Sequence, residues 1–289
     1  MLVERACIVG VGLLGGSLAL ALKKKGIARQ AVGTSRTSTT LKRALDVGVL
    51  DEAYPDAEQA VRDCDLVVLC TPIGTMAALA SRIAPVLSEG TLLTDVGSTK
   101  RQVVQAIEPL QGSFRFVGGH PLAGSERTGV AYARQDLFEN RTYFLTPTEG
   151  SDPAALSRLQ DLVLAIGARP VMLSPEEHDH LVAITSHLPH VLACLAVALV
   201  RDESLTPEEL EQALGQGFLD VTRVAAGGAE MWTDILLTNA DNVDSLLQRI
   251  IHLAERTRLH LKGAARTELF QWLEDAAQFR RSLGNKDHD

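Results

Sequence analysis

The chain has 289 residues, of which 46% are hydrophobic and 22% are charged, and its formal net charge is −8 at pH 7. This length suggests two domains, and the composition is ordinary for a globular protein. The negative charge provides no basic surface for nucleic acid, and no apolar run approaches the roughly 20 residues that a bilayer span needs. We therefore expect small-molecule partners, with no nucleic acid and no membrane.

The first residues lead directly into a strand-like run without the pattern of a secretory signal, so a cytoplasmic protein is expected. The four cysteines, Cys7, Cys64, Cys70 and Cys194, include no Cys-x-x-Cys pair and lie in or beside apolar stretches. Reduced core cysteines are therefore expected rather than disulfides.

Residues 6 to 173 alternate short apolar runs with longer helical patterns, which is typical of strands joined by crossover helices. The predicted strands are Ala6–Val9, Ala31–Thr34, Asp65–Thr71, Thr91–Asp95, Arg115–Gly118, Thr142–Thr146 and Arg169–Leu173. The pattern predicts an α/β domain over residues 1–173, built on a doubly wound, mostly parallel sheet.

A glycine-rich segment, ACIVGVGLLGGSLALALKKKG, begins at residue 6 and places a Gly-x-Gly-x-x-Gly spacing between a predicted strand and a predicted helix. Gly10 allows a tight turn, Gly12 lets the backbone approach a pyrophosphate, and Gly15 lets the helix and strand pack closely. Free N–H groups at the helix start attract the anion. The context predicts a Rossmann-type dinucleotide-binding domain; the alternative is a glycine-rich turn without a ligand.

The end of the second predicted strand indicates which dinucleotide binds, because an acidic residue there would accept hydrogen bonds from a ribose 2′-hydroxyl. The segment GTSR at 33–36 has no acid, and its Arg36 beside hydroxyl groups suits the 2′-phosphate of NADP. NADP is favoured and NAD is possible, because Arg36 could instead be a solvated residue or stack on adenine. The predicted cofactor-binding residues are Gly10, Gly12, Leu13, Leu14, Gly15, Ser35, Arg36, Thr71 and Pro72.

After Leu173 the pattern becomes helical, and Ser174-Pro175-Glu176-Glu177 provides a cap, a proline at the first helical position and a carboxylate three residues after the cap. Further helices are predicted over His187–Arg201, Thr206–Gly215, Asp241–Leu261 and Thr267–Ser282, with no strand before Leu283. Residues 188–200 are apolar on nearly all sides, so they should be buried in the protein or in a subunit interface. Residues 174–289 are thus predicted to form an all-α domain for substrate binding and dimerisation.

Three further motifs are TDVGSTK at 94–100, GGHPLAGSERTG at 118–129, and the pair SHLPH at 186–190 with GFLDVTRVA at 217–225. Their order and spacing resemble the prephenate and arogenate dehydrogenase family, from the first strand to about residue 260. The resemblance implies oxidation of prephenate to 4-hydroxyphenylpyruvate with loss of carbon dioxide, in tyrosine biosynthesis. Arogenate is the alternative substrate. We expect a homodimer that associates through the helices after Leu173.

His120 matches the family's HPxAG segment, which places it as the base that accepts the substrate's hydroxyl proton. We expect it just after a strand, at the carboxyl edge of the sheet. Without the resemblance it would be interpreted as a structural loop residue. Ser98 could orient His120 or contact the nicotinamide, or it could cap a helix.

Arg223 is the predicted anchor for a substrate carboxylate, because its guanidinium can make two parallel charge-assisted bonds. This role requires a site between the two domains. The alternative is an ion pair with Asp220, one helical turn away. The family usually has arginine where this chain has Leu219, so a second arginine contact is not expected.

The remaining residues of the predicted substrate site are Ser125, Glu126, Asp220 and His187. Glu126 could interact with Asp220 or Arg223, and Ser125 lies in the part of the motif associated with the choice between prephenate and arogenate. His187 is a substrate-pocket residue by resemblance. Trp232 resembles a position near the pocket or the subunit interface, although core packing would also explain it.

His178, His180, His187 and His190 raise the alternative of a metal site, but no metal is expected, because cysteines are not nearby and Pro189 disrupts simple helical geometry. A hydroxyacid or pyrroline-carboxylate reductase would share the glycine turn and the helical second domain but lack the segment at 118–129. A non-catalytic nucleotide-sensing protein would have no reason to keep His120, Ser98 and Arg223 together.

Overall fold

The computed structural model describes residues 3–124 and 127–283. Backbone contacts divide the chain into two compact units, residues 1–240 and 241–289. The first unit holds all the strands of the described residues and the helices up to residue 239, so it extends beyond the predicted boundary at residue 173. The division into functional domains at residue 173 therefore remains a prediction.

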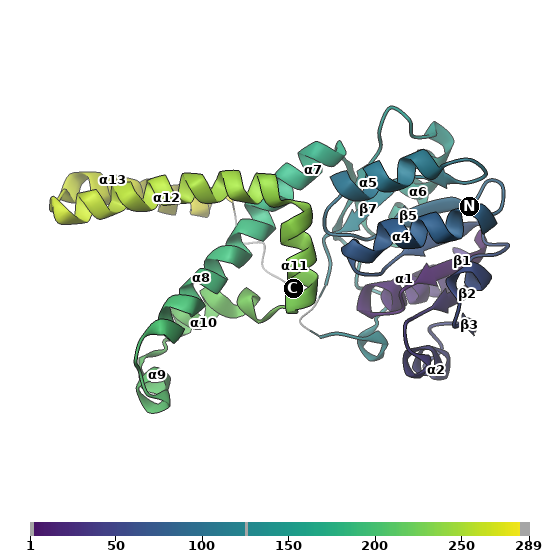
Figure 1. Ribbon diagram of the computed structural model, residues 1–289, viewed down its shortest axis with the longest axis horizontal. Helices are drawn as coiled ribbons and strands as arrows, with labels where there is room; N and C mark the ends of the chain where they lie inside the picture. The colour runs from purple at the N-terminus through teal and green to yellow at the C-terminus, as the bar shows by residue number, and fades with distance from the viewer. Residues whose placement is uncertain (1–2, 125–126, 284–289) are drawn as a thin grey trace. The chain divides into compact units, whose positions relative to one another are not determined.

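The main sheet has six parallel strands in the order β3-β2-β1-β4-β5-β6. Figure 1 labels β1, β2, β3 and β5 of this sheet. The strands are β1 (Val3–Val9), β2 (Ala28–Thr34), β3 (Glu52–Tyr54), β4 (Leu66–Leu69), β5 (Leu92–Asp95) and β6 (Arg115–Phe116). The chain order reverses between β1 and β4, and ligands of open α/β sheets bind at the carboxyl ends of strands at such a point. The glycine turn follows β1 there.

Helices cover both faces of this sheet, as the doubly wound pattern predicts. They are α1 (Leu13–Lys24), α2 (Ser38–Asp46), α3 (Ala57–Ala60), α4 (Ile73–Ile83), α5 (Arg101–Ile107) and α6 (Pro153–Ala165). Alternate residues of β1 point to opposite faces: Ile8 packs in one apolar cluster with α1 and α6, and Val9 packs in another with α4 and α5.

A second sheet of three strands was not predicted. It contains β7 (Gly118–Pro121), β8 (Thr142–Thr146) and β9 (Arg169–Met172), with β7 antiparallel to β8 and β8 parallel to β9. The predicted strand at 115–118 is therefore divided between two sheets. A Cβ on Gly118 would lie 2.4 Å from Thr146 Oγ1, and one on Gly119 would lie 2.8 Å from the carbonyl oxygen of Asp95. Glycine is needed because β7 lies so close to β8 and to the end of β5.

Residues 174–240 are helical, and the predicted capping box at Ser174 and Glu177 is confirmed. The elements are α7 (Pro175–Val182), the π-helical turn η4 (Ala183–His187), α8 (Leu188–Asp202), α9 (Pro207–Ala213), α10 (Gln216–Thr222), the 3₁₀ turn η5 (Arg223–Ala226) and α11 (Ala229–Thr238). No strand occurs in residues 174–283, all of which are described, as predicted. The short helices α10 and α11 were not predicted.

The helical run Pro175–Asp202 is long and apolar enough to cross a membrane by length and composition alone. Its buried side chains include His178, Asp179, His187 and His190, which contact other side chains of the same chain. Buried polar groups with partners are typical of a helix packed against protein. Many apolar side chains of α8 are nevertheless exposed, with Leu199 at 71%, so this chain by itself does not bury the apolar surface of α8.

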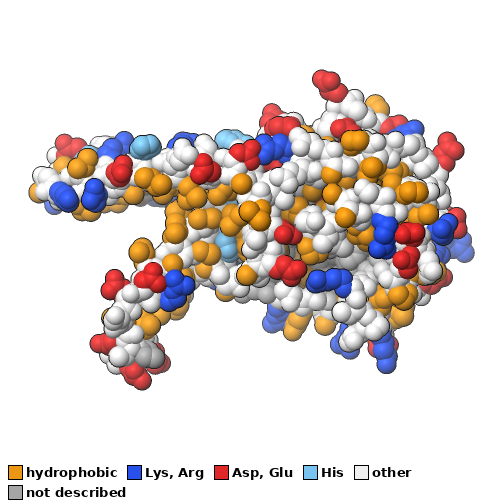
Figure 2. Space-filling view, viewed as in Figure 1, with side chains coloured by type: hydrophobic (Ala, Val, Ile, Leu, Met, Phe, Trp, Pro, Cys, Tyr) orange, Lys and Arg blue, Asp and Glu red, His pale blue; other side chains and the backbone are white. Residues whose placement is uncertain are grey.

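The second unit contains α12 (Ala240–Lys262), apart from its first residue, and α13 (Arg266–Ser282), which are joined through a left-handed turn at Ala264 with φ +49°. These helices also expose large apolar residues, among them Leu259, Leu261, Phe270 and Phe279. Figure 2 shows hydrophobic side chains on the surface of the helical part of the chain. Exposed apolar area of this extent is typical of a protein–protein interface.

Candidate active site

The glycine turn after β1 has the geometry that a bound dinucleotide requires. Gly10 has φ +104°, and a Cβ on it would lie 2.6 Å from the Cys70 carbonyl oxygen. A Cβ on Gly15 would lie 2.4 Å from the Gly10 carbonyl oxygen, so both positions need glycine to bring the backbone segments together. A Cβ on Gly12 would meet no protein atom within 4 Å, which leaves this face of the turn open.

The start of α1 fits an anionic ligand for the same reason. Gly12 is the N-cap, no side chain caps the helix, and the first turn, which contains Leu13 and Leu14, has no acidic residue. An uncapped helix N-terminus beside an open glycine face is the arrangement that binds a pyrophosphate. These residues therefore fit a dinucleotide.

The other predicted cofactor residues lie at or near the same edge of the sheet. Thr71 and Pro72 follow β4, the neighbour of β1, and Pro72 is the N-cap of α4. Ser35 and Arg36 follow β2, and the Arg36 side chain is 82% exposed, with Nη1 3.9 Å from an Oε1 of Glu230. An exposed pair at this distance holds the side chain weakly, so Arg36 is available to a ligand.

His120 lies inside strand β7, not after a strand of the parallel sheet as predicted. The reason is that the chain leaves the parallel sheet at Val117 and pairs antiparallel with β8. Gly119, the preceding residue, lies against the end of β5, so His120 still lies near the carboxyl edge of the main sheet. Its side chain is 9% exposed, and its Nδ1 lies 2.8 Å from Nε2 of His178.

Electrostatics favour a neutral His120. Burial is the largest cause that lowers its pKa well below the ordinary value of 6.5, and the nearby His178, Lys100 and His187 lower it further. Burial also lowers the pKa of His178, although its hydrogen bond with Asp179 opposes the shift. Both imidazoles are therefore neutral near pH 7, as a general base must be before it accepts a proton.

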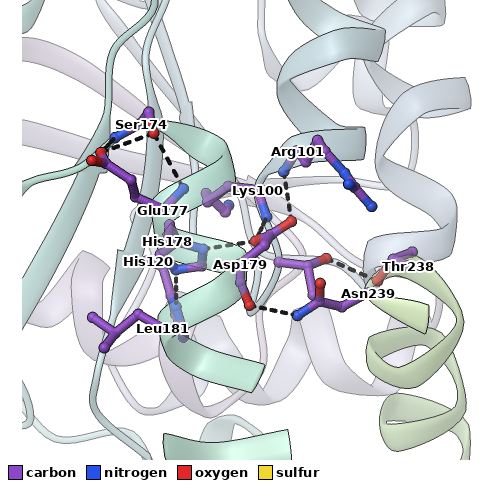
Figure 3. Close-up of polar contacts among 12 residues, drawn as sticks. Lys100, Arg101, His120, Ser174, Glu177, His178, Asp179, Leu181, Thr238 and Asn239 are labelled. Atoms are coloured by element: carbon purple, nitrogen blue, oxygen red, sulfur yellow. Dashed lines mark hydrogen bonds and ion pairs between the residues drawn. The ribbon is translucent and has the colours of Figure 1, made fainter. Parts of the chain in front are cut away.

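Asp179 on α7 connects His178 to the N-terminus of α5 (Figure 3). Its Oδ1 lies 2.8 Å from Nδ1 of His178 and accepts a hydrogen bond from the Lys100 amide at 2.7 Å, and its Oδ2 accepts one from the Arg101 amide at 2.9 Å. Sequence reasoning considered His178 only as a metal ligand and did not consider Asp179. The available signal was the His178-Asp179 pair that directly follows the capping box.

A buried ion pair supports the strand that carries His120. Lys100 Nζ donates to Asp95 Oδ2 and, at 2.8 Å, to the Gly119 carbonyl, and the Gly119 amide donates to Asp95 Oδ1 at 3.1 Å. Burial lowers the pKa of Lys100, and the attraction of Asp95 opposes this shift. The TDVGSTK motif therefore fixes the backbone immediately before His120. Ser98 lies half-buried in this loop, and the N-cap of α5 is Lys100 rather than Ser98.

His187 ends the π-helical turn and is 1% exposed. Its Nδ1 lies 3.1 Å from Nδ2 of Asn239, and the same Nδ2 donates to the Asp179 carbonyl at 2.7 Å. Burial is the main cause that lowers the pKa of His187 to about 4. Across residues 3–124 and 127–283, no three His, Cys, Asp or Glu side chains are placed to hold a metal ion.

Trp232 on α11 packs against histidines as well as apolar residues. Its ring stacks on His190 with a centroid distance of 3.6 Å and an angle of 10°, and it meets His187 edge-on at 6.1 Å. Trp232 also contacts the apolar cluster that includes α4. It therefore connects α11 to the turn that carries His187.

The predicted anchor, Arg223, and the predicted substrate-binding residue Asp220 lie on the exposed surface of the helical part. Arg223 opens η5, Asp220 is in α10, and both are exposed, as is Leu219. The Asp220 carboxylate accepts a hydrogen bond from Gln216 Nε2 at 2.7 Å. Ser125 and Glu126 lie outside the described residues.

The polar side chains around His120 suit the site to acid–base chemistry. A neutral, buried imidazole lies at the edge of the sheet where the glycine turn provides room for a dinucleotide. Such a pair of features supports removal of a proton and a hydride from one carbon–oxygen unit.

The chain matches two family models, the nucleotide-binding domain of prephenate dehydrogenase over residues 18–172 and its dimerization domain over residues 174–275. A prephenate dehydrogenase of Bacillus subtilis is 36% identical over 279 residues, which cover 96% of this chain and 75% of the relative. A crystal structure of the Aquifex aeolicus prephenate dehydrogenase, in complex with hydroxyphenyl propionate and NAD⁺, is 33% identical with a TM-score of 0.89, and the match covers 97% of this chain and 98% of that chain.

A crystal structure of an arogenate dehydrogenase from Synechocystis is also similar, at 29% identity and a TM-score of 0.83, over 97% of this chain and 100% of that chain. The two family models together span most of the chain, and the similarity to the Bacillus subtilis relative extends over nearly all of it. The chain therefore belongs to the prephenate dehydrogenase family.

Proposed function

We propose that the protein is a prephenate dehydrogenase that converts prephenate to 4-hydroxyphenylpyruvate and carbon dioxide in tyrosine biosynthesis. The observation that supports this most directly is the buried, neutral His120, whose Nδ1 lies 2.8 Å from His178 in a chain similar to these enzymes over nearly its full length. The reaction needs one base, one group that binds a substrate carboxylate, and a hydride acceptor, all held in the correct relative orientation.

The residues proposed to hold the cofactor are Gly10, Gly12, Leu13, Leu14, Gly15, Ser35, Arg36, Thr71 and Pro72. When bound, the oxidised nicotinamide ring accepts a hydride from the substrate. We propose a preference for NADP over NAD, because the end of β2 offers the exposed Arg36 and no acid. The Aquifex relative was crystallised with NAD⁺, so the two cofactors must be compared directly.

His120 is the proposed catalytic base. As the ring carbinol is oxidised, its hydroxyl proton moves to Nε2 of His120, because Nδ1 is already paired with His178. The ring then has a ketone opposite the ring carboxylate. Loss of carbon dioxide moves the carboxylate's bonding electrons into the ring, which becomes an aromatic phenolate, and His120 can return its proton to that oxygen. Ser98 is proposed to orient His120 or to contact the nicotinamide.

Arg223 is the proposed anchor for a substrate carboxylate, with His187, Ser125, Glu126 and Asp220 as the other proposed substrate-binding residues. A site built from Arg223 and His120 requires the nucleotide-binding domain, 1–173, and the helical domain, 174–289, to face each other. An Arg223→Ala variant should mainly raise KM for the substrate, and an unchanged KM would reject the anchor.

A homodimer is proposed from the exposed apolar face of α8 and from the match of residues 174–275 to a dimerization domain. A cytoplasmic location is proposed because the substrate and cofactor are small charged metabolites and the family members are biosynthetic enzymes.

Arogenate remains the second candidate substrate, because a similar structure is that of an arogenate dehydrogenase. A non-catalytic nucleotide-sensing role is disfavoured by the buried hydrogen bonds that connect His120 to His178 and Asp179. A protein that only binds a nucleotide would not need them.

The test is to assay the purified full chain with prephenate and with arogenate, each against NAD and NADP. We expect oxidation of prephenate with a higher kcat/KM for NADP than for NAD. The His120→Asn variant should bind the cofactor normally but turn over at least about 100-fold more slowly, as expected when a general base is lost. Activity with arogenate but not with prephenate would make arogenate the substrate. An equal or higher kcat/KM with NAD would refute the cofactor preference. No activity with either substrate would refute the function.

A further inference from the structure

Asp179 is connected to two histidines of the candidate site, His120 and His187, through its carboxylate and its main-chain carbonyl. Its carboxylate is paired with His178, which in turn contacts His120, and its main-chain carbonyl accepts a hydrogen bond from Asn239, which in turn contacts His187. All of these side chains are at least nine-tenths buried. Because buried hydrogen-bonding groups need complementary partners, these contacts determine where the ring protons are.

The contacts on the His120 side can be followed from the carboxylate outward (Figure 3). A carboxylate that accepts two amide hydrogen bonds needs a donor from His178, so Nδ1 of His178 carries the proton. A neutral His178 then has a bare Nε2, which can only accept. His120 must therefore donate from Nδ1 across the 2.8 Å contact, and its Nε2 is left without a proton.

The contacts on the His187 side lead to the opposite result. The Asn239 atom that lies 2.7 Å from the Asp179 carbonyl must be the amide nitrogen, because two oxygens would repel each other there. The same nitrogen lies 3.1 Å from Nδ1 of His187, so that Nδ1 accepts. A neutral His187 then carries its only ring proton on Nε2.

We propose that Asp179 and Asn239 fix opposite tautomers in His120 and His187, so that the site presents one bare imidazole nitrogen and one imidazole N–H to the substrate. This inference rests on the proposed function, in which both rings line the substrate site. The bare Nε2 of His120 takes the hydroxyl proton, and the Nε2–H of His187 donates a hydrogen bond to a substrate oxygen. His178, Asp179 and Asn239 are positioning residues, because they act through these two rings.

The tautomers can be measured without any substrate. In ¹⁵N-histidine-labelled full-length protein near pH 7.5, long-range ¹H–¹⁵N spectra distinguish a protonated Nδ1 from a protonated Nε2. Signals are assigned with single histidine substitutions. We expect His120 protonated at Nδ1 and His187 protonated at Nε2. The same tautomer in both rings, or a proton on Nε2 of His120, would overturn the proposal.

The Asn239→Asp variant tests the His187 side, because a carboxylate oxygen can accept from Nδ1 but cannot donate to it. We expect the proton of His187 to move to Nδ1 and the substrate KM to rise, with kcat changed less. Asn140→Asp makes the same change in an exposed turn and should leave both the spectrum and KM unaltered. An Asn239→Asp variant that folds and keeps the Nε2 proton on His187 would contradict the proposal.

The His178 variants test the His120 side. His178→Leu removes the acceptor for Nδ1 of His120, and His178→Gln retains an acceptor oxygen at a similar reach. We expect His178→Leu to lower kcat on the order of 10- to 100-fold, the effect typical of partners that orient a functional imidazole, with cofactor affinity unchanged. His178→Gln should recover most of kcat. Equal kcat in the two variants would indicate a packing role only.

These readouts separate this inference from the proposed function. If the spectra show opposite tautomers but neither prephenate nor arogenate is oxidised, the proposed function fails and the tautomer assignment stands. If substrate is oxidised but the spectra show one tautomer in both rings, the function stands and this inference fails.

Discussion

Gly12 differs from Gly10 and Gly15 because an added side chain there would not collide with the protein. A Cβ on Gly12 would meet no protein atom within 4 Å, whereas one on Gly15 would lie 2.4 Å from a backbone oxygen. The open position faces the space where a pyrophosphate would approach the start of α1. We therefore expect folding and cofactor binding to depend on different glycines of the same turn.

We expect Gly12→Ala to keep or slightly raise the thermal stability, because replacing glycine at a permitted conformation stabilises by about 0.4–1 kcal/mol. Its cofactor Kd should rise on the order of 10-fold or more, since the methyl group occupies the space of the phosphate. Calorimetric titration and thermal unfolding measure both effects. Gly15→Ala is the comparison and should destabilise the fold, and a Gly12→Ala protein with unchanged cofactor Kd would contradict the assignment.

Individual residues were predictable where the chemistry is local in the sequence. The glycines and the capping box at Ser174 are recognised by spacing alone, and both have the expected geometry. The connection from Asp179 to His120 joins residues 59 positions apart, as the numbers in the sequence show, and it depends on the docking of α7 against β7 and α5. No periodicity in the sequence reports such docking.

At the scale of the element, α7 is the helix on which the site depends most. Its capping box satisfies the amides at its start, and the following turn presents His178 and Asp179 to α5 and β7. Thr206 and Glu209 form the same capping box at the start of α9.

Ser174→Ala should lower the stability by about 1 kcal/mol, the usual cost of losing an N-cap side chain. Because fraying of this helix end displaces His178 and Asp179, we also expect kcat to fall several-fold. Thr206→Ala removes the equivalent cap from α9, which carries none of the residues paired with His120 or His187, and should leave kcat unchanged. Thermal unfolding and steady-state assays compare the two, and equal kcat values in both variants would contradict the expectation.

The elements that were not predicted from the sequence have two physical causes. The strand β3 has three residues and α10 has seven, so their periodicities are too brief to be recognised. The division of residues 115–121 between two sheets is decided by the close approach of Gly118 and Gly119 to other strands, which is a tertiary effect. The longer elements of the doubly wound pattern were found because each repeats its pattern over several residues.

At the scale of the whole molecule, the buried histidines couple stability to pH. Burial lowers the pKa values of His120, His178 and His187, so each ring binds a proton less readily in the folded chain than in the unfolded chain. Their contribution to stability is therefore present above about pH 6.5, the unfolded pKa, and is lost as pH falls below it. For His187 the loss extends from pH 6.5 down to about 4.

We expect the free energy of unfolding to fall between pH 6.5 and pH 4, and the slope to be shallower in His187→Gln, which lacks one of the titrating rings. A single proton taken up only on unfolding contributes about 1.4 kcal/mol per pH unit. Urea unfolding at several pH values measures both slopes. Identical slopes for wild type and variant would show that His187 is not protonated on unfolding in this range.

The exposed apolar residues of α8 predict association of two copies in solution. Leu199 is 71% exposed, and Leu164, on α6 of the nucleotide-binding domain, is 57% exposed. We expect sedimentation to show a dimer for the wild type. Leu199→Glu should raise the dissociation constant of the dimer on the order of 10-fold or more, because a charge is costly in an apolar interface. Leu164→Glu should sediment like the wild type. A wild-type monomer, or a Leu199→Glu dimer of normal affinity, would refute this interface.

The amides of Lys100 and Arg101 donate to a carboxylate that comes from beyond residue 173. A truncated chain that stops at the end of β9 would retain the glycine turn, yet the first turn of α5 and the ring of His120 would both lose their acceptors. We expect such a fragment, if it folds, to keep the proposed dinucleotide-binding turn. We therefore expect that grafting the nucleotide-binding half onto another substrate domain would transfer affinity for the cofactor without transferring the proposed base in its working state.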